Sequence, residues 1–289
     1  MPAAVKMECE LLDQHYSKIV SDRPIAHFAL RGFDDLVGGV KPGRMTILAG
    51  EPGTAKTTLF GQLADDLAEQ GIPVIFFTFE LDSSALVAKS LLRIVGGLPG
   101  GDMAESYLGE SGRRLLDGAR DTYRCCIAQR IAYVDQACSP VEMAAFVADV
   151  EAKTGVKPAV FVDYLQICEA EGVVDERLAI KHIVGGLRSL ANGYDVPVYA
   201  ISSVSRQGYA TKAKSAKTGL DVLGGCSYIE YSADTVLHLS ADVEASSSSV
   251  DGQSRPLVLR ALKNRYGAVG SSLLELRPAA ATFLDRSEA

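Results

Sequence analysis

One short segment of the chain has glycine, lysine and threonine at a spacing that suits phosphate binding. It fits the pattern G-x-x-x-x-G-K-[ST], except that alanine replaces the second glycine. The eight residues are Gly50, Glu51, Pro52, Gly53, Thr54, Ala55, Lys56 and Thr57. Backbone N–H groups of residues 53–58, ending with Thr58, would surround a β-phosphate at the positive end of the following helix. We therefore expect a nucleotide site, and the alternative is a glycine-rich turn with a surface lysine.

Three residues of this segment carry specific expectations. Lys56 would neutralise oxygens of the β- and γ-phosphates, and Thr57 would bind Mg²⁺ through its hydroxyl. Ala55 has the smallest side chain after glycine, so the substitution is tolerable if this residue keeps φ below zero.

Two acidic residues end apolar runs that are expected to be strands. Asp163 closes the run 159-AVFVD-163, and Glu80 closes the run 74-VIFFTFE-80. A carboxylate at Asp163 would position the metal through water, and one at Glu80 would polarise the attacking water as a general base. The alternatives are a helix-capping aspartate and a glutamate at an ordinary surface position.

The elements that must position these residues alternate between apolar strands and amphipathic helices. The expected strands are 45–49, 73–79, 131–135, 159–163, 196–202, 235–239, 257–262 and 271–276, and the expected helices are 57–70, 83–95, 140–154 and 176–192. Continuous apolar strands are typical of a parallel sheet covered on both faces. The sequence therefore predicts an α/β fold with a doubly wound, mostly parallel sheet that its last strands extend in antiparallel fashion. Two stretches, 203–222 and 245–254, interrupt the pattern and are expected to be mobile surface loops.

Composition narrows the class of protein. The 289 residues are 47% hydrophobic and 22% charged, which suits one large α/β domain or two small ones. No stretch approaches the roughly 18 apolar residues of a membrane span, and no signal-peptide pattern occurs, so we expect a cytoplasmic protein with no membrane partner. The 6 cysteines and 4 histidines are scattered without metal-ligand spacing. A formal net charge of −7 means that any nucleic-acid-binding residues must be concentrated locally.

The first 24 residues stand apart from the alternating pattern. Leu12, Tyr16, Ile19 and Val20 fall on one stripe of a short amphipathic helix that ends before Pro24. This helix would pack either on its own domain or, as an arm, on a neighbouring subunit. We therefore divide the chain into an arm at 1–24 and one domain at 25–289.

Segments spread over most of the chain resemble the ATPase domain of DnaB-type replicative helicases, within the RecA-like class. In chain order they are 32-GFDDLVGGVKPGRMTILAGEPGTAKTT-58, 76-FFTFEL-81, 161-FVDYLQI-167, 196-VPVYAISSVSR-206, 229-IEYSAD-234 and 262-LKNRYGAVG-270. The run Asp-Tyr-Leu-Gln after the strand and the pattern Lys-x-Arg-x-Gly near the end are much more specific than a phosphate loop alone. The resemblance implies that 25–289 is a RecA-like ATPase domain.

The resemblance implies ATP and Mg²⁺ as cofactors, with Asp163 as the Walker B acid and Glu80 as the catalytic base. It also implies that Lys263 and Arg265 act in trans, reaching the γ-phosphate of the neighbouring subunit's ATP. An arginine supplied across an interface stabilises charge in the transition state and couples hydrolysis to subunit contact. Without the resemblance, the default interpretation of these two residues is a solvated edge strand.

The chain departs from the family pattern in three places. Ser203 occupies the position where the family has a glutamine that senses the γ-phosphate. Only about 25 residues precede the ATPase core, where the family has a primase-binding domain. The interval 99–130 matches poorly, so its structure is not predicted.

A basic segment, 207-QGYATKAKSAKTG-219, is the main candidate for nucleic-acid binding. In the resembled family this loop faces the central channel of a hexameric ring and follows the phosphates of one DNA strand. The candidate DNA-binding residues are Arg206, Lys212, Lys214, Lys217 and, on another loop, Arg177. Binding of this kind is sequence-tolerant and salt-sensitive. The alternative is a solvated basic loop.

Together these features favour an ATP- and Mg²⁺-dependent helicase or translocase that acts on single-stranded DNA as a hexameric ring in replication. Its implied partners are further copies of itself, single-stranded DNA, and a primase or a loader. Its short N-terminal region favours a stand-alone version from a phage or mobile element. Two alternatives are a RecA/RadA-type recombinase and a nucleotide-gated assembly or loader protein without motor activity. An added nuclease activity is unsupported, because no second carboxylate cluster is visible.

Overall fold

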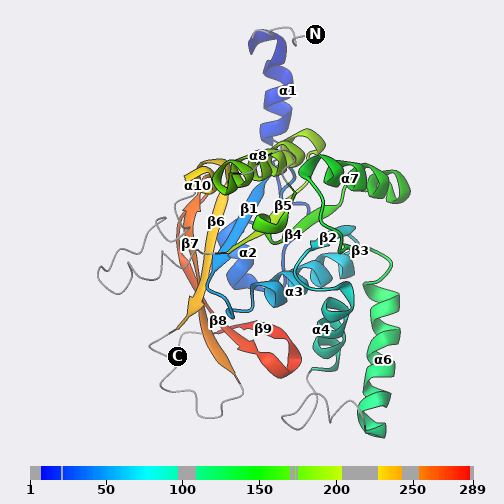
Figure 1. Ribbon diagram of the computed structural model, residues 1–289. Helices are drawn as coiled ribbons and strands as arrows, with labels where there is room; N and C mark the ends of the chain where they lie inside the picture. Colours follow the sequence, from blue (N-terminus) through cyan, green and yellow to red (C-terminus); the bar gives the residue numbers. More distant parts are fainter. Residues whose placement is uncertain are drawn as a thin grey trace.

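A nine-stranded sheet forms the centre of the computed structural model, which describes residues 8–20, 22–96, 109–169, 173, 175–203, 227–242 and 254–286 (Figure 1). The strand order is β3-β2-β4-β5-β1-β6-β7-β8-β9. The parallel strands are β1 (Met45–Gly50), β2 (Val74–Thr78), β3 (Ile131–Val134), β4 (Ala159–Asp163), β5 (Val198–Ser203) and β6 (Thr235–Ala241). The antiparallel strands are β7 (Arg255–Asn264), β8 (Ser271–Arg277) and β9 (Thr282–Asp285). The predicted fold class is therefore confirmed.

Helices cover both faces of the parallel part of the sheet. One face packs against α2 (Arg31–Val37), α3 (Lys56–Glu69) and α4 (Ser83–Val95), and the other packs against α7 (Pro140–Thr154) and α8 (Glu176–Tyr194). The other helices in the described residues are α1 (Glu8–Val20), α6 (Glu110–Cys126), α10 (Ser227–Ser232) and the short 3₁₀ helices η1 (Leu165–Ile167) and η3 (Pro278–Ala280). Predicted helices 83–95 and 140–154 are confirmed to the residue, because Asp82 and Ser139 cap their N-termini with side-chain hydrogen bonds.

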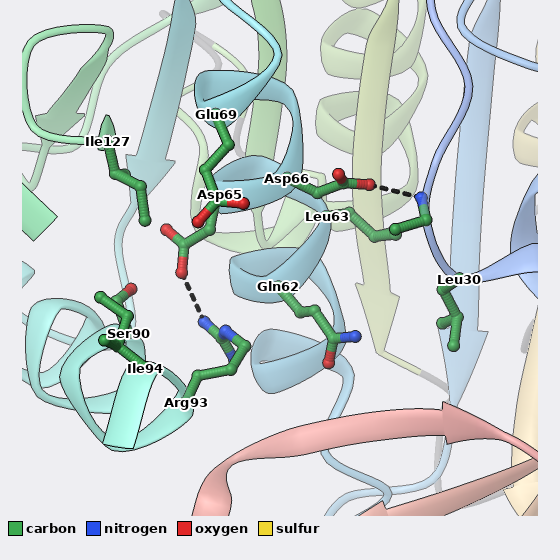
Figure 2. A pocket seen from close by; sticks show the side chains of 11 residues that line it. Leu30, Gln62, Leu63, Asp65, Asp66, Glu69, Ser90, Arg93, Ile94 and Ile127 are labelled. Carbon is green, nitrogen blue, oxygen red and sulfur yellow. Dashed lines mark hydrogen bonds and ion pairs between the residues drawn. The ribbon is translucent and has the colours of Figure 1, made fainter. Parts of the chain in front are cut away.

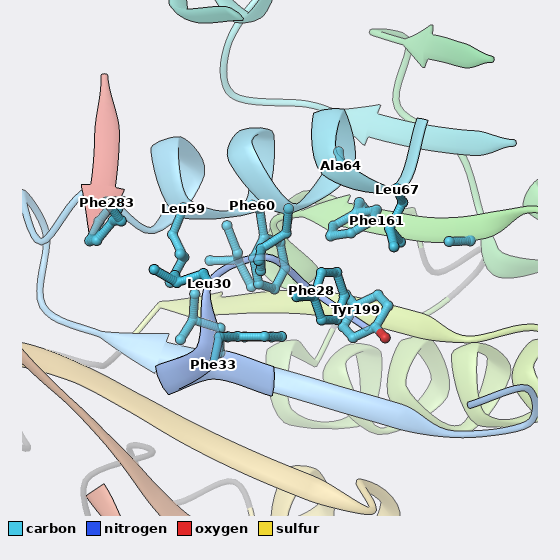
Figure 3. Close-up of a cluster of buried hydrophobic side chains, with 14 of the residues drawn as sticks. Phe28, Leu30, Phe33, Leu59, Phe60, Ala64, Leu67, Phe161, Tyr199 and Phe283 are labelled. Atoms are coloured by element: carbon cyan, nitrogen blue, oxygen red, sulfur yellow. The ribbon is translucent and has the colours of Figure 1, made fainter. Parts of the chain in front are cut away.

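Aromatic packing fixes the helix that follows the phosphate loop. Phe60 of α3 meets Phe161 of β4 edge-on, with ring centroids 5.4 Å apart, and Phe161 stacks on Tyr199 of β5 at 4.9 Å (Figure 3). All three side chains are buried. Aromatic pairs of this kind contribute about 0.5–1.5 kcal/mol beyond their buried area. The loop is therefore attached to a helix that cannot shift without disrupting the core.

The last strand, β9, supplies the N-terminal cap of helix α2. The Asp285 carboxylate of β9 accepts hydrogen bonds from the backbone N–H groups of Arg31 and Gly32, at 2.9 and 2.7 Å. Leu30, at the N-cap position of α2, makes no side-chain cap, so Asp285 supplies the missing acceptor. Gln62 of α3 exchanges two hydrogen bonds with the backbone of Phe283. Elements α2, α6, α10 and β9 were not predicted from the sequence.

The N-terminal helix α1 extends away from the rest of the domain (Figure 1). Its predicted apolar stripe is exposed to solvent: Leu12 58%, Tyr16 64%, Ile19 72% and Val20 54%. The stripe therefore does not pack on its own domain, and packing on a neighbouring subunit stays a prediction. None of the helices in the described part of the chain has the length and apolar character needed to span a bilayer.

Candidate nucleotide-binding site

The phosphate loop lies at the carboxyl end of β1 and leads directly into α3. Two glycines meet its backbone requirements. Gly53 has φ +82°, and a Cβ on Gly50 would lie 2.5 Å from the Leu239 carbonyl of the neighbouring strand. The Lys56 ammonium donates to the carbonyls of Gly50 and Glu51, at 2.9 Å each. Lys56 is thus held over the loop where a bound phosphate would lie.

Ala55 corrects one expectation. It has φ +64° rather than a negative value, and it precedes the first turn of α3 in the left-handed conformation. Consecutive N–H groups point into one anion-binding hollow only when the backbone alternates between right- and left-handed conformations. A residue with a Cβ adopts the left-handed conformation at a cost of about 1–2 kcal/mol.

Asp163, at the carboxyl end of β4, is a buried carboxylate with unsatisfied oxygens. It is 1% exposed, and neither oxygen has a hydrogen-bond partner among the described residues. Burial raises the pKa of Asp163 to about 6; the nearby Thr57 hydroxyl opposes this rise, Glu80 adds to it, and Lys56 opposes it. An unsatisfied carboxylate beside a hydroxyl and an ammonium is suited to a ligand that supplies positive charge.

Glu80 and Lys56 complete the same site. Glu80 is exposed and lies two residues beyond the end of β2, next to β4 in the sheet. Burial lowers the pKa of Lys56, while the charges of Asp163, Glu80 and Glu51 oppose this shift. The structure therefore gathers the predicted ammonium, hydroxyl and carboxylates at one edge of the sheet.

The donor set suits Mg²⁺ only together with a phosphate. In the described part of the chain, no group of three or more His, Cys, Asp or Glu side chains could hold a metal ion alone. Thr57 and Asp163 offer oxygen ligands, and Mg²⁺ usually binds through one or two protein ligands plus waters and substrate phosphates.

Lys263 and Arg265 lie at the opposite end of the sheet. Lys263 is in the part of β7 that pairs with the first residues of β6, and Arg265 directly follows β7, whereas the phosphate loop adjoins the other end of β6 at Leu239. The six residues of β1 separate the two ends by about 17 Å, at about 3.3 Å per residue. These two cations are therefore not brought to the phosphate loop of their own chain.

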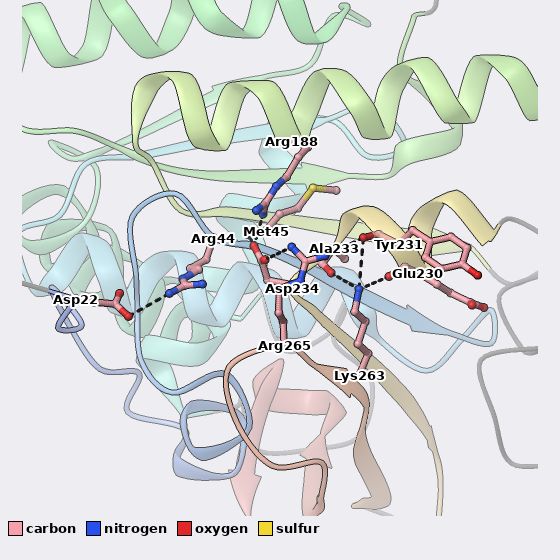
Figure 4. A network of polar contacts seen from close by, with 10 residues as sticks. All are labelled: Asp22, Arg44, Met45, Arg188, Glu230, Tyr231, Ala233, Asp234, Lys263 and Arg265. Carbon is pink, nitrogen blue, oxygen red and sulfur yellow. Dashed lines mark hydrogen bonds and ion pairs between the residues drawn. The ribbon is translucent and has the colours of Figure 1, made fainter. Parts of the chain in front are cut away.

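The cations at this end contact groups of their own chain (Figure 4). The Lys263 ammonium donates to the Ala233 carbonyl at 2.8 Å and also to the carbonyls of Glu230 and Tyr231, near the end of α10. Arg265 donates to the Asp234 carboxylate at 3.0 Å and to the Tyr231 carbonyl at 3.0 Å. Sequence reasoning missed Asp234, whose only signal was its place in the segment 229-IEYSAD-234.

Most of the predicted DNA-binding residues lie outside the described residues. This applies to Arg206, Lys212, Lys214 and Lys217, and to most of the two predicted loops at 203–222 and 245–254. Arg177 is described, and it is exposed in the first turn of α8. Ser203 is the last residue of β5. Beside it, Ser202 accepts a hydrogen bond from the Gln166 amide at 3.1 Å.

A cavity of about 240 Å³ beside α3 is separate from this site (Figure 2). Its polar groups join elements of the fold: Arg93 of α4 pairs with Asp65 of α3 at 2.8 Å, and Asp66 accepts from the backbone N–H of Ala29 at 2.6 Å. Burial raises the pKa of Asp65, and the charge of Arg93 opposes that rise. The polar residues that line the cavity therefore serve to hold α3, α4 and the segment before α2 together.

Comparison with known proteins identifies a matching family model and relatives. Residues 27–285 match the model described as the DnaB-like helicase C terminal domain. The replicative DNA helicase DnaB of Pasteurella multocida is 27% identical over 255 residues, which are 85% of this chain and 53% of that protein. The chain thus spans about half the length of the curated relatives it matches.

Solved structures are similar over almost the whole chain. One solved ATPase domain superposes with a TM-score of 0.82 and 21% identity, covering 98% of this chain and all of that one. A DnaB-like replicative helicase, studied for its interactions with primase, gives a TM-score of 0.80 and 20% identity over 99% of this chain and 68% of its own. This likeness establishes a RecA-like fold.

Proposed function

Because this chain belongs to the DnaB-like helicase C-terminal domain family, we propose that it is the ATP-hydrolysing motor of a replicative DNA helicase. It would act on single-stranded DNA as a hexameric ring, with ATP and Mg²⁺ bound between subunits. One observation carries this proposal: Lys56, Thr57 and Asp163 meet at one end of the sheet, and Lys263 and Arg265 lie at the other. A site with both sets of charges needs two copies of the chain.

Each residue at the phosphate loop has a distinct task in this proposal. The loop N–H groups and the Lys56 ammonium bind and orient the phosphates, and Thr57 and Asp163 hold the metal, directly or through water. Mg²⁺, when bound, supplies positive charge that neutralises the developing charge on the phosphate oxygens. Glu80 accepts the proton of the attacking water as general base, and its exposed position leaves room for that water.

Arg265 and Lys263 of an adjacent subunit would complete the site in trans. A guanidinium placed at the γ-phosphate stabilises the transition state by a factor of about 10³–10⁵. Because the two ends of the sheet face different neighbours, repeating the contact generates a chain of subunits that closes when the rotation allows. The exposed apolar stripe of α1 supports a second contact, in which the arm packs on the next subunit.

DNA would run through the centre of this ring. The basic segment containing Arg206, Lys212, Lys214 and Lys217 supports this proposal by its charge alone, and Arg177 supports it by its exposure on α8. A primase or a loader is a further proposed partner. The support is the structural likeness to the helicase studied with primase.

Steady-state ATP hydrolysis tests the proposed function. Turnover would be measured with Mg²⁺, with and without single-stranded DNA, using Lys56→Ala as the blank. We expect hydrolysis that DNA stimulates and that Lys56→Ala abolishes. Turnover that ignores DNA would contradict the motor and favour a nucleotide-gated assembly protein. Imaging of the ATP-bound protein on DNA separates closed rings from the filaments of a recombinase.

A further inference from the structure

Asp234 is a buried junction of three elements (Figure 4). It is 1% exposed and lies between α10 and the start of β6. One carboxylate oxygen accepts the backbone N–H of Met45 at 3.0 Å and pairs with Arg188 of α8, while the other accepts from Arg265 at 3.0 Å. The side chain therefore ties the start of β1 and helix α8 to the proposed trans arginine.

The Arg265 side chain is held by hydrogen bonds that engage only some of its N–H donors. Its backbone N–H donates to the Asp234 carbonyl at 2.8 Å, and its two terminal nitrogens donate to the Asp234 carboxylate and the Tyr231 carbonyl. A guanidinium has five N–H donors in a fixed plane, so donors remain for a phosphate of another subunit. The side chain is 39% exposed. It is thus fixed in direction and still accessible.

Arg188 adds a second positive charge beside the Asp234 carboxylate. A single Arg–Asp pair would be neutral overall and would present little net charge to a γ-phosphate. With Arg188 on the same carboxylate, the three groups carry two positive charges and one negative charge. The cluster therefore retains one net positive charge while Arg265 is held in place.

The turn after Arg265 is fixed independently. Tyr266 stacks on the Arg44 guanidinium, with 3.2 Å from its central carbon to the ring centroid. Asn264 donates to the Leu36 carbonyl at 3.1 Å and accepts the backbone N–H of Tyr266 at 3.1 Å. With the backbone held by these contacts, the Asp234 carboxylate and the Tyr231 carbonyl set the direction of the Arg265 side chain, and of the two only Asp234 carries a charge.

We propose that Asp234 is a positioning residue that aims Arg265 at the ATP of the neighbouring subunit, and that Arg188 keeps the held arginine electrostatically active. This inference rests on the proposed function, because it assumes that Arg265 acts in trans. Neither residue touches the nucleotide of its own subunit, since both lie at the far end of the sheet.

Steady-state kinetics of Arg188 and Asp234 variants are the first test. A displacement of about 1 Å in a catalytic group lowers a rate by about 10²-fold, so we expect Asp234→Asn to lower kcat by about 10–100-fold. We expect Arg188→Gln to lower kcat by about tenfold, the loss that 1.4 kcal/mol of transition-state charge stabilisation represents, and Arg188→Lys to recover most of it. KM for ATP should stay near wild type for the Arg188 variants, because the phosphate loop is untouched. Arg120→Gln, an exposed ion-paired arginine of α6, is the matched control and should leave kcat unchanged.

Mixed oligomers separate positioning from folding. Asp234→Asn subunits retain an intact phosphate loop, and Lys56→Ala subunits retain an intact arginine. Mixing the two should therefore restore turnover above that of either variant alone, because some interfaces combine both intact halves. A failure of this rescue, or an Arg188→Gln variant with wild-type kcat, would overturn the inference. If Arg265→Ala itself hydrolysed ATP normally, the trans assignment would fail first, and the two failures are thus distinguishable.

Discussion

Two buried aspartates, one at each end of the sheet, show how differently the two ends are built. Asp163 and Asp234 are both 1% exposed, and each borders a parallel strand. Asp234 accepts hydrogen bonds from two guanidinium groups and a backbone N–H. The Asp163 oxygens have no such partner among the described residues. One end is therefore complete within the chain, while the other leaves a charge to be neutralised by something that binds.

This difference indicates which end of the sheet lowers the stability of the protein when no ligand is bound. A buried carboxylate without a partner destabilises the folded state, whereas one shared between cations is largely compensated. Lys56, held by the carbonyls of Gly50 and Glu51, and Ala55, with its positive φ, belong to the same uncompensated end. Nucleotide and metal would stabilise that end on binding, since a ligand that binds only the folded state stabilises it.

Removing Arg265, at the end of the sheet where the buried charge is paired, should have the largest effect on activity. Arg265→Ala removes the proposed trans charge, so we expect kcat to fall by about 10³-fold or more. The affinity for ATP should stay within a few-fold of wild type, because the phosphate loop is untouched. Stopped-flow binding of a fluorescent ATP analogue together with steady-state turnover checks both parts. Equal losses of affinity and kcat would show that the residue is not a trans group.

The pH dependence of the free energy of unfolding should show how strongly the buried Asp163 carboxylate destabilises its end of the sheet. Its pKa is 3.8 in the unfolded chain and about 6 in the folded protein, so the folded state binds more protons between these values. The free energy of unfolding therefore falls as the pH rises from about 4 to about 6, because the buried carboxyl must then ionise in the folded protein. The difference between the two pKa values corresponds to about 3 kcal/mol.

The measurement compares urea unfolding of wild type and Asp163→Asn across pH 4.5–7, without nucleotide or Mg²⁺. Wild type should lose stability relative to Asp163→Asn as pH rises. Asp149→Asn, which changes an exposed carboxylate paired with Lys153, should instead run parallel to wild type. Parallel curves for Asp163→Asn as well would mean that burial leaves this carboxyl unperturbed.

The smallest effect is expected from relieving the loop backbone. Ala55→Gly removes a Cβ from a residue with φ +64°, so the free energy of unfolding should rise by about 0.5–1 kcal/mol. The same change at Ala148, exposed in helix α7, should lower it by about 1 kcal/mol. Chemical denaturation of the two variants provides the check. A destabilised Ala55→Gly variant would indicate that the loop has another conformation in solution.

Local signals predicted most of the fold. Apolar runs such as 159–163 identify buried parallel strands, and caps such as Asp82 and Ser139 mark helix ends. The elements that were missed depend on distant residues. Helix α2 has seven residues and takes its cap from Asp285, and the very polar α6 shows few apolar positions in sequence. The Asp285 cap is not visible in a short window of sequence, and the few apolar positions of α6 give no strong helix signal there.

The candidate site divides in the same way. Lys56, Thr57, Asp163 and Glu80 were predicted because spacing and strand ends determine where they lie. The grouping of Arg188, Asp234 and Met45 was not, because it arises only when α8 and β6 meet at the start of β1. The condition of a negative φ at Ala55 is not met, since side-chain size alone does not reveal the backbone conformation that an anion-binding hollow requires.

The cap that Asp285 provides to α2 bears on how the protein is made. A ribosome synthesises residues 31 and 32 first and adds their hydrogen-bond acceptor 254 and 253 positions later. Until the β9 segment has left the exit tunnel, helix α2 lacks its acceptor and helix α3 lacks the two hydrogen bonds between Gln62 and the backbone of Phe283. Native closure of this domain therefore waits for the synthesis of β9, and nascent chains stalled before β9 would present an unfinished edge to chaperones.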